Sequence, residues 1–122
     1  MRVLAVAVGS HGDVLPLLAI ATELRRRGHA VTLAAPAPFA TMAARADLPF
    51  FALGTEEDYR RAAAETGLWR PWRGVRLMFR HVSVLTEPTY AWLAGNARPG
   101  ESVVLASTLA LGARVAQEKL GL

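Results

Sequence analysis

The sequence predicts an α/β domain in which helices flank a Rossmann-like parallel sheet, with residues 1–122 forming one domain. Four short apolar runs alternate with amphipathic segments of helical period. The first run meets the first helix at a turn that contains Gly9 and Gly12. Hydrophobic residues make up 52% of the chain, enough for a sizeable core. Because strand–helix–strand units favour parallel pairing with right-handed crossovers, we expect the strand order 3-2-1-4.

The first unit of this pattern is a strand at Arg2–Val8 and a helix at Val14–Arg27. Apolar residues recur at helical spacing along the helix, at Leu17, Ile20, Ala21 and Leu24. Pro16 would lie in the first helical turn, where a missing N–H costs little. Gly28 is typical of the residue that follows the end of a helix.

The same alternation continues through the first half of the chain. A second strand is expected at Ala30–Ala35, a short helix at Phe39–Ala46 and a third strand at Pro49–Leu53. Glu56–Glu65 has the composition of a helix, which Gly67 would end.

The second half begins with a predicted loop at Trp69–Gly74. Apolar residues at helical spacing then predict a helix over Val75–Leu85. Pro88 would break or kink this helix, with a second piece at Thr89–Ala97. The last unit is a strand and a helix, at Ser102–Ser107 and Leu109–Leu120.

The turn after the first strand presents the polar side chains of Ser10, His11 and Asp13. Asp13 suits a helix cap, because its carboxylate can accept hydrogen bonds at the positive end of the helix dipole. His11 suits a solvated loop residue. Doubly wound α/β proteins also place ligands at such turns, so a functional role is the alternative for both residues. Spacing alone leaves the two interpretations open.

Two stretches carry a family resemblance, Gly9-Ser10-His11-Gly12-Asp13-Val14-Leu15-Pro16 and Leu24–Pro36. Together they resemble the start of a family 1 glycosyltransferase of GT-B fold, and in particular bacterial enzymes that glycosylate natural products, sterols or lipids. The resemblance covers the first forty residues well and the last twenty moderately. It implies an N-terminal, acceptor-side domain with Asp13 as the catalytic base, His11 as the less favoured candidate, and acceptor contacts at Gly9, Ser10 and Gly12.

The resemblance also implies the reaction, which is inverting transfer of a sugar from a nucleotide-diphosphate donor to a hydroxyl of a lipophilic acceptor. No cofactor is implied. In relatives the donor is held mainly by a second domain, so we expect a C-terminal donor-binding domain or companion chain, and little activity from these 122 residues alone. In histidine-based relatives an acid near the end of strand four orients the base. Leu105–Thr108 contains no acid, which agrees with an aspartate base and leaves an inactive site open.

Aromatic and basic residues are interspersed between strands three and four. The resemblance implies that Trp69, Trp72, Phe79 and Trp92 shape the acceptor pocket, and packing of these rings in the core is the alternative. Four arginines lie among them, at Arg70, Arg73, Arg76 and Arg80. They form either a solvated helix face or a surface for peripheral contact with an anionic membrane.

Several other classes of protein are excluded or disfavoured. The net charge of +4 is mild and dispersed, which disfavours nucleic-acid binding. The chain has no cysteine, no Walker motif and only two glycines where a nicotinamide-binding turn needs three. With no signal-peptide pattern and no long apolar run, we expect a cytoplasmic protein. A non-catalytic Rossmann-like binding or partner domain, such as half of a split glycosyltransferase, remains the alternative function.

Overall fold

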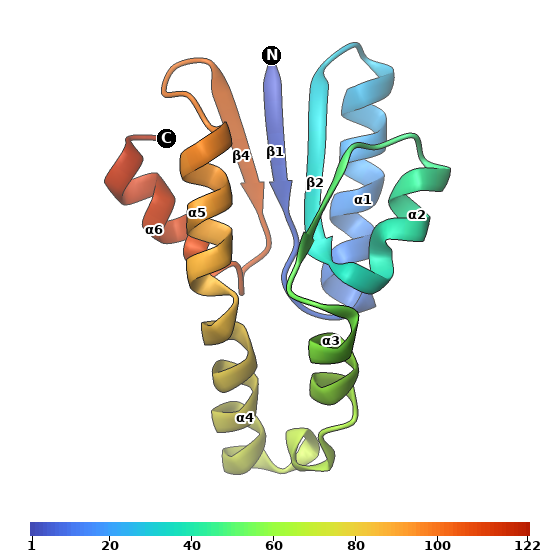
Figure 1. Ribbon diagram of the computed structural model, residues 1–122, viewed down its shortest axis with the longest axis vertical. Coiled ribbons are helices and arrows are strands. Elements are labelled where there is room, and N and C mark those ends of the chain that lie inside the picture. The colour runs from blue at the N-terminus through green and yellow to red at the C-terminus, as the bar shows by residue number, and fades with distance from the viewer.

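The computed structural model describes residues 1–122 and contains a four-stranded parallel sheet in the order β3-β2-β1-β4 (Figure 1). The strands are β1 (Arg2–Val6), β2 (Ala30–Pro36), β3 (Phe50–Leu53) and β4 (Ser102–Ala106). The predicted fold class and strand order are therefore confirmed. The central strand, β1, pairs with β2 on one side and β4 on the other, so the turn that follows it leaves the middle of the sheet.

Two layers of helices cover the faces of the sheet (Figure 1). The helical elements in chain order are α1 (His11–Arg26), η1 (Ala37–Phe39), α2 (Ala40–Arg45), α3 (Glu56–Ala63), η2 (Thr66–Trp69), α4 (Pro71–Val84), α5 (Thr86–Asn96) and α6 (Leu111–Leu120). Helices α1 and α2 bury one face, through residues such as Val14, Ala21 and Ala43. Helices α5 and α6 bury the other face. Burial of both faces is the condition that a parallel sheet requires.

Helix α1 begins at His11, three residues earlier than the sequence predicts. Ser10 is the N-cap residue, and Asp13 is the third residue of the helix. The expectation that Asp13 itself is the N-cap is therefore wrong. Pro16 consequently lies in the second turn, where its missing N–H leaves the Gly12 carbonyl without its usual helical donor.

Helix α4 also begins earlier than predicted, at Pro71, so the expectation of a loop through Gly74 is wrong. Proline is favoured at the first helical position, because its fixed φ suits the helix and its missing N–H would be unpaired there. Gly74 lies inside this helix, and the position requires glycine because a side-chain carbon there would overlap the carbonyl of Leu68. Pro88 breaks the helical segment as predicted, but the break lies at Leu85 and Pro88 falls in the first turn of α5.

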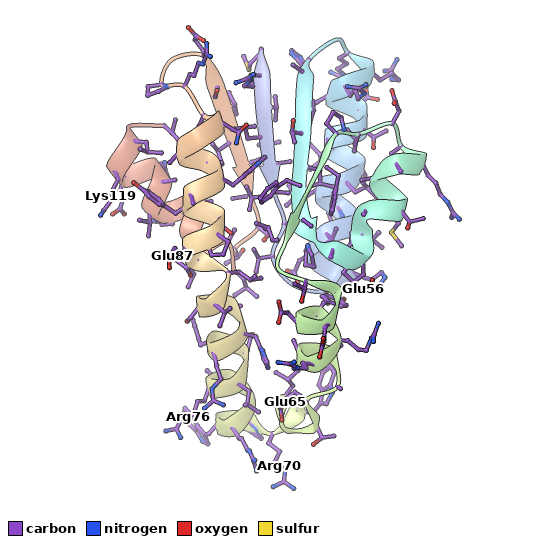
Figure 2. All side chains as sticks on the ribbon, viewed as in Figure 1. Glu56, Glu65, Arg70, Arg76, Glu87 and Lys119 are labelled. Carbon is purple, nitrogen blue, oxygen red and sulfur yellow. The ribbon has the colours of Figure 1, made fainter.

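Helices α3 and α4 extend beyond the carboxyl ends of the strands, along the longest axis of the molecule (Figure 1). Figure 2 places Arg70 and Arg76 at the far end of this extension, with Glu56 closer to the sheet. No helix of the chain has the length and apolar character needed to cross a bilayer. The β1–α1 turn and the two helices α3 and α4 therefore lie at the same edge of the sheet, the one formed by the carboxyl ends of its strands.

Candidate functional site

The candidate site is the turn Ala7–Ser10 together with the first turn of α1. The Ala7 N–H still donates to the Ala34 carbonyl at 2.8 Å, and Val8 is buried, so the chain stays anchored to the sheet two residues beyond β1. Gly9 then turns the backbone with φ of +131°, a conformation that L side chains rarely adopt. The rigid sheet therefore fixes where α1 begins and where its first side chains point.

The Asp13 carboxylate folds back onto this turn. Its Oδ2 accepts a hydrogen bond from the Ser10 N–H at 3.1 Å. A side-chain carbon on Gly9 would overlap the same carboxylate, so only glycine leaves room for it. Asp13 is half-buried and forms no ion pair. The arrangement is half of a capping box, in which an acidic residue at the third position of a helix bonds the backbone of the N-cap.

Ser107, just after β4, holds the other side of the turn. The Val8 N–H donates to Ser107 Oγ at 2.9 Å, and Ser107 Oγ donates to the Val8 carbonyl at 3.2 Å. The Ser107 N–H also donates to the Val6 carbonyl at 2.9 Å. Ser107 lies within Leu105–Thr108, the segment at the end of strand four that contains no acidic residue. It fixes the backbone that leads to Asp13 rather than contacting the Asp13 side chain.

His11 lies on the opposite side of the turn from Ser107. Its ring meets the buried ring of Phe39 edge to face, with 4.9 Å between centroids. Phe39 meets Tyr59 of α3 in the same manner, at 5.8 Å. His11 is exposed, and its contact with Phe39 places its ring on the side of the turn where η1 and α3 lie. The structure thus separates the two titratable side chains of the turn, since Asp13 points back at the loop and His11 points across the sheet edge.

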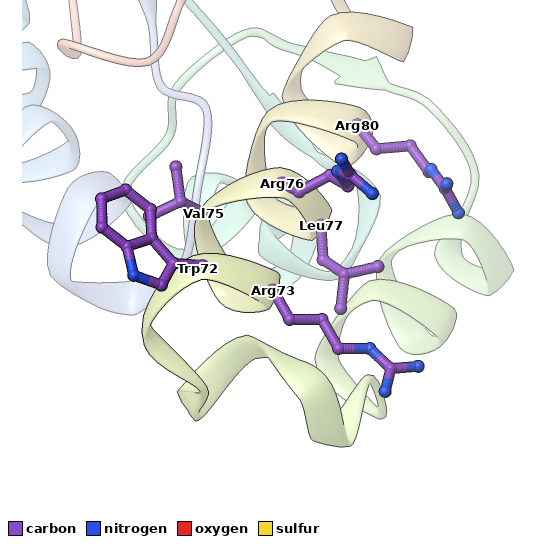
Figure 3. A pocket seen from close by; sticks show the side chains of 6 residues that line it. All are labelled: Trp72, Arg73, Val75, Arg76, Leu77 and Arg80. Carbon is purple, nitrogen blue, oxygen red and sulfur yellow. The ribbon is translucent and has the colours of Figure 1, made fainter.

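The four candidate aromatic residues do not form one cluster. Trp92 is only 8% exposed, and its ring stacks on Phe51 with 5.4 Å between centroids. Trp92 is therefore a core residue, as the packing alternative has it. Trp69 and Trp72 are 93% and 89% exposed, and Phe79 is 47% exposed. These three lie on η2 and α4, where Trp72, Val75 and several arginines line an open groove (Figure 3).

The remaining candidates are backbone positions. Ser10 and Gly12 are exposed at the start of α1, and Gly12 has open space where a side chain would stand. No group of three or more His, Cys, Asp or Glu side chains lies close enough together to hold a metal ion. What the geometry offers is one carboxylate and a helix N-terminus at the carboxyl end of the central strand, which is the usual ligand position of doubly wound sheets.

Comparison with known proteins places this arrangement in a family. The family model described as "Glycosyltransferase family 28 N-terminal domain" matches residues 3–122. The chain belongs to this family. Glycosyltransferase GtfE of Amycolatopsis orientalis is 36% identical over 124 aligned residues, which cover 100% of this chain and 29% of GtfE. The resemblance to GT-B glycosyltransferases of natural-product pathways is thereby confirmed.

Solved structures agree with this membership. The Streptomyces sp. SF2575 glycosyltransferase SsfS6, complexed with thymidine diphosphate, superposes with a TM-score of 0.75 and 25% identity, covering 100% of this chain and 36% of SsfS6. The spinosyn rhamnosyltransferase SpnG superposes with a TM-score of 0.64 and shares the fold at 23% identity, covering 100% of this chain and 33% of SpnG. The chain spans about a third of the length of the relatives it matches.

Replacing Ser107 in this glycosyltransferase domain by alanine is expected to lower the free energy of unfolding by about 1–3 kcal/mol, because two half-buried backbone groups of Val8 lose their partner. Urea denaturation measures the change. Thr108→Ala is the matched control, since Thr108 is exposed and forms no side-chain hydrogen bond. Equal stability of the two variants would show that the hydroxyl of Ser107 does not hold the turn.

Proposed function

We propose that the protein containing this domain transfers a sugar from a nucleoside-diphosphate sugar to a hydroxyl of a lipophilic acceptor, with inversion at the anomeric carbon. The observation that carries the proposal is the position of Asp13, a carboxylate at the start of α1 and at the carboxyl end of the central strand. Transfer to a hydroxyl requires a proton acceptor beside the attacking oxygen, and a carboxylate within hydrogen-bond reach can supply it.

The single hydrogen bond of the Asp13 side chain supports this role, because it leaves one carboxylate oxygen free. Oδ2 accepts from the Ser10 N–H, whereas Oδ1 accepts no hydrogen bond from the protein. In the proposed reaction the acceptor oxygen forms a bond to the anomeric carbon as the bond from that carbon to the diphosphate breaks. The hydroxyl proton passes to Asp13, and the nucleoside diphosphate leaves with the bonding electron pair. Attack from the face opposite the leaving group inverts the anomeric centre.

The proposed donor and acceptor classes rest on relatives. SsfS6 was solved with thymidine diphosphate, which supports a nucleoside-diphosphate sugar as donor. An O-mycaminosyltylonolide 6-deoxyallosyltransferase of Streptomyces fradiae is 40% identical over 58 residues, covering 48% of this chain and 14% of that enzyme. Its name supports a natural-product acceptor. The exposed side chains of Trp72 and Phe79 beyond the sheet edge add apolar surface suited to a lipophilic molecule. The donor would be held mainly by a further domain or a companion chain.

A transfer assay with the full-length protein tests the proposal. We expect a glycosylated product, with release of nucleoside diphosphate, when thymidine- and uridine-diphosphate sugars are screened against macrolide and polyketide aglycones by mass spectrometry. The proton coupling constant at the anomeric carbon should show inverted configuration. Retained configuration would refute the direct displacement. A folded protein that transfers none of these sugars would favour the non-catalytic binding or partner domain.

A further inference from the structure

A groove on helix α4, which we call the α4 groove, is a second concave feature of the domain. It encloses about 730 Å³, within the range of about 300–1,000 Å³ that is typical of small-molecule sites. Figure 3 shows Trp72 and Val75 on one side of the helix and Arg73 and Arg80 on the other, with Arg76 between them. The full lining is Trp72, Arg73, Val75, Arg76, Leu77 and Arg80. The groove therefore has an apolar part and a basic part.

The apolar part consists of one buried side chain and two that the core leaves in water. Leu77 is buried and packs so closely on η2 that a side-chain carbon on Gly67 would overlap it. Trp72 is almost fully exposed, and Val75 is about half exposed. Large apolar side chains that stay in contact with water mark an interaction surface. The indole of Trp72 offers a flat face on which a planar ring system can stack.

The basic part consists of three arginines at helical spacing. Arg73, Arg76 and Arg80 follow one another at intervals of three and four residues, so they are neighbours along the helix surface. The Nε and Cδ atoms of Arg73 lie 3.4 and 3.5 Å from the point where a side-chain carbon on Gly67 would stand. Glycine at that position thus leaves room for the Arg73 side chain to lie along η2, beside Leu77.

No carboxylate of the chain neutralises these three arginines. The six ion pairs of the domain are all formed by other arginines. Helix α4 contains no aspartate or glutamate, and Glu65, which precedes η2, forms no ion pair. Each guanidinium stays charged and presents several N–H donors that match the oxygens of an acidic group. The groove is therefore complementary to a compact ligand that is both apolar and negatively charged.

We propose that the α4 groove binds a small organic anion, a flat apolar ring system that carries a carboxylate, sulfonate or phosphate. The rings would stack on Trp72 and contact Leu77, and the acidic group would accept hydrogen bonds from Arg73 and Arg76. In the proposed transfer reaction, on which this part of the inference rests, the anion is the lipophilic acceptor. Such an acceptor would be an extended molecule, because Asp13 lies at the sheet edge from which the helical extension projects (Figure 1).

Titration of the full-length protein with two naphthalene dyes tests the site. 8-Anilinonaphthalene-1-sulfonate is an anion, and N-phenyl-1-naphthylamine has the same rings without the charge. We expect the sulfonate to bind with a Kd that rises with salt. Arg73→Gln/Arg76→Gln should raise that Kd by about 25-fold, because an ion pair at an exposed site contributes up to about fivefold. The same variant should leave the Kd of the neutral dye unchanged.

Matched variants outside the groove are the controls. Arg45→Gln/Arg114→Gln has the same net charge but alters exposed arginines on α2 and α6, and it should keep the parent Kd for both dyes. Trp72→Ser should weaken both dyes by about tenfold, whereas Val115→Ser on α6 should weaken neither. Far-UV circular dichroism confirms that each variant is folded.

Two results of the titration would overturn the proposal. One is an equal Kd of the sulfonate for the two double arginine variants, and the other is a folded parent protein that does not bind the sulfonate. If such a parent were a dimer that Trp72→Ser dissociates, as seen by light scattering, the occupant of the groove would be a second copy of the chain.

Transfer assays decide whether the bound anion is the acceptor. For an aglycone with a carboxylate and for its methyl ester, we expect kcat/KM of the parent to be about 25-fold higher for the acid. Arg73→Gln/Arg76→Gln should remove this preference, mainly through KM, because the arginines bind the acceptor without taking part in the reaction. Equal use of acid and ester by the parent would refute the acceptor assignment. Dye binding without transfer to either aglycone would refute the proposed function and leave the anion site in place.

Discussion

Asp13→Asn in the full-length protein is expected to lower sugar transfer by about 10²–10⁴-fold, the range that general-base assistance contributes. The expected change in the free energy of unfolding is small. The amide oxygen of asparagine can still accept the Ser10 N–H that Asp13 Oδ2 accepts at 3.1 Å, so the helix start keeps its hydrogen bond. Asparagine cannot take up the acceptor proton as a carboxylate does. Initial rates at saturating donor and acceptor, with urea denaturation of the same preparation, measure both effects.

The domain contains a matched control for this substitution. Asp58 occupies the same position in α3, where its Oδ2 accepts the Thr55 N–H at 3.0 Å. The hydrogen bonds from the Thr55 N–H and hydroxyl hold the pKa of Asp58 below its usual value. Asp58→Asn therefore alters an equivalent helix start without touching the proposed site, and it should leave transfer unchanged.

His11→Ala separates the two titratable groups of the turn. If Asp13→Asn keeps full activity and His11→Ala abolishes it, the base is His11. If neither variant changes transfer, the turn only shapes the acceptor site.

The sheet could be predicted because the signals for each strand lie within the strand and the residues directly beside it. Each apolar run is short, is bounded by glycine or proline, and is followed by a helical pattern, so all four strands lie within two residues of their expected ends. The errors arise where two local signals compete. Ser10 with Asp13 three positions later is a helix-start pattern, and the predicted start at Val14 overlooks it. Pro71 is treated as a loop residue in the prediction, although proline equally begins a helix.

The site could be predicted only in part, because some of its contacts join distant segments. The turn and Asp13 follow from the first sixteen residues. The hydrogen bonds between Ser107 and the Val8 backbone cannot be predicted in this way, because the two residues are 99 positions apart and no spacing rule connects them. The tryptophans illustrate the same limit. Trp92 and Trp72 both lie on helices of the second half of the chain. Trp92 is buried because Phe51 of the neighbouring strand stacks on it, whereas Trp72 is almost fully exposed.

Gly9→Ala is expected to lower transfer by about 10²-fold, the effect that displacing a reacting group by about 1 Å can have. The φ of +131° at Gly9 disfavours any L side chain, and the added carbon would overlap the Asp13 carboxylate. The carboxylate must then leave the Ser10 N–H, or the turn must shift relative to the sheet. Since Ser107 and β1 hold the turn, movement of Asp13 is the smaller change.

The same substitution should also lower the free energy of unfolding by about 1–3 kcal/mol, the cost of a residue held in a sparsely populated backbone region. Gly95→Ala is the control, because Gly95 lies within α5, has no positive φ and has open space for a side chain. In that helix alanine should stabilise the fold slightly and leave kcat unchanged. If Gly9→Ala turned over as fast as Gly95→Ala while still carrying its stability cost, the position of the Asp13 carboxylate beside Gly9 would not matter for transfer, and the assignment of Asp13 as the base would fail with it.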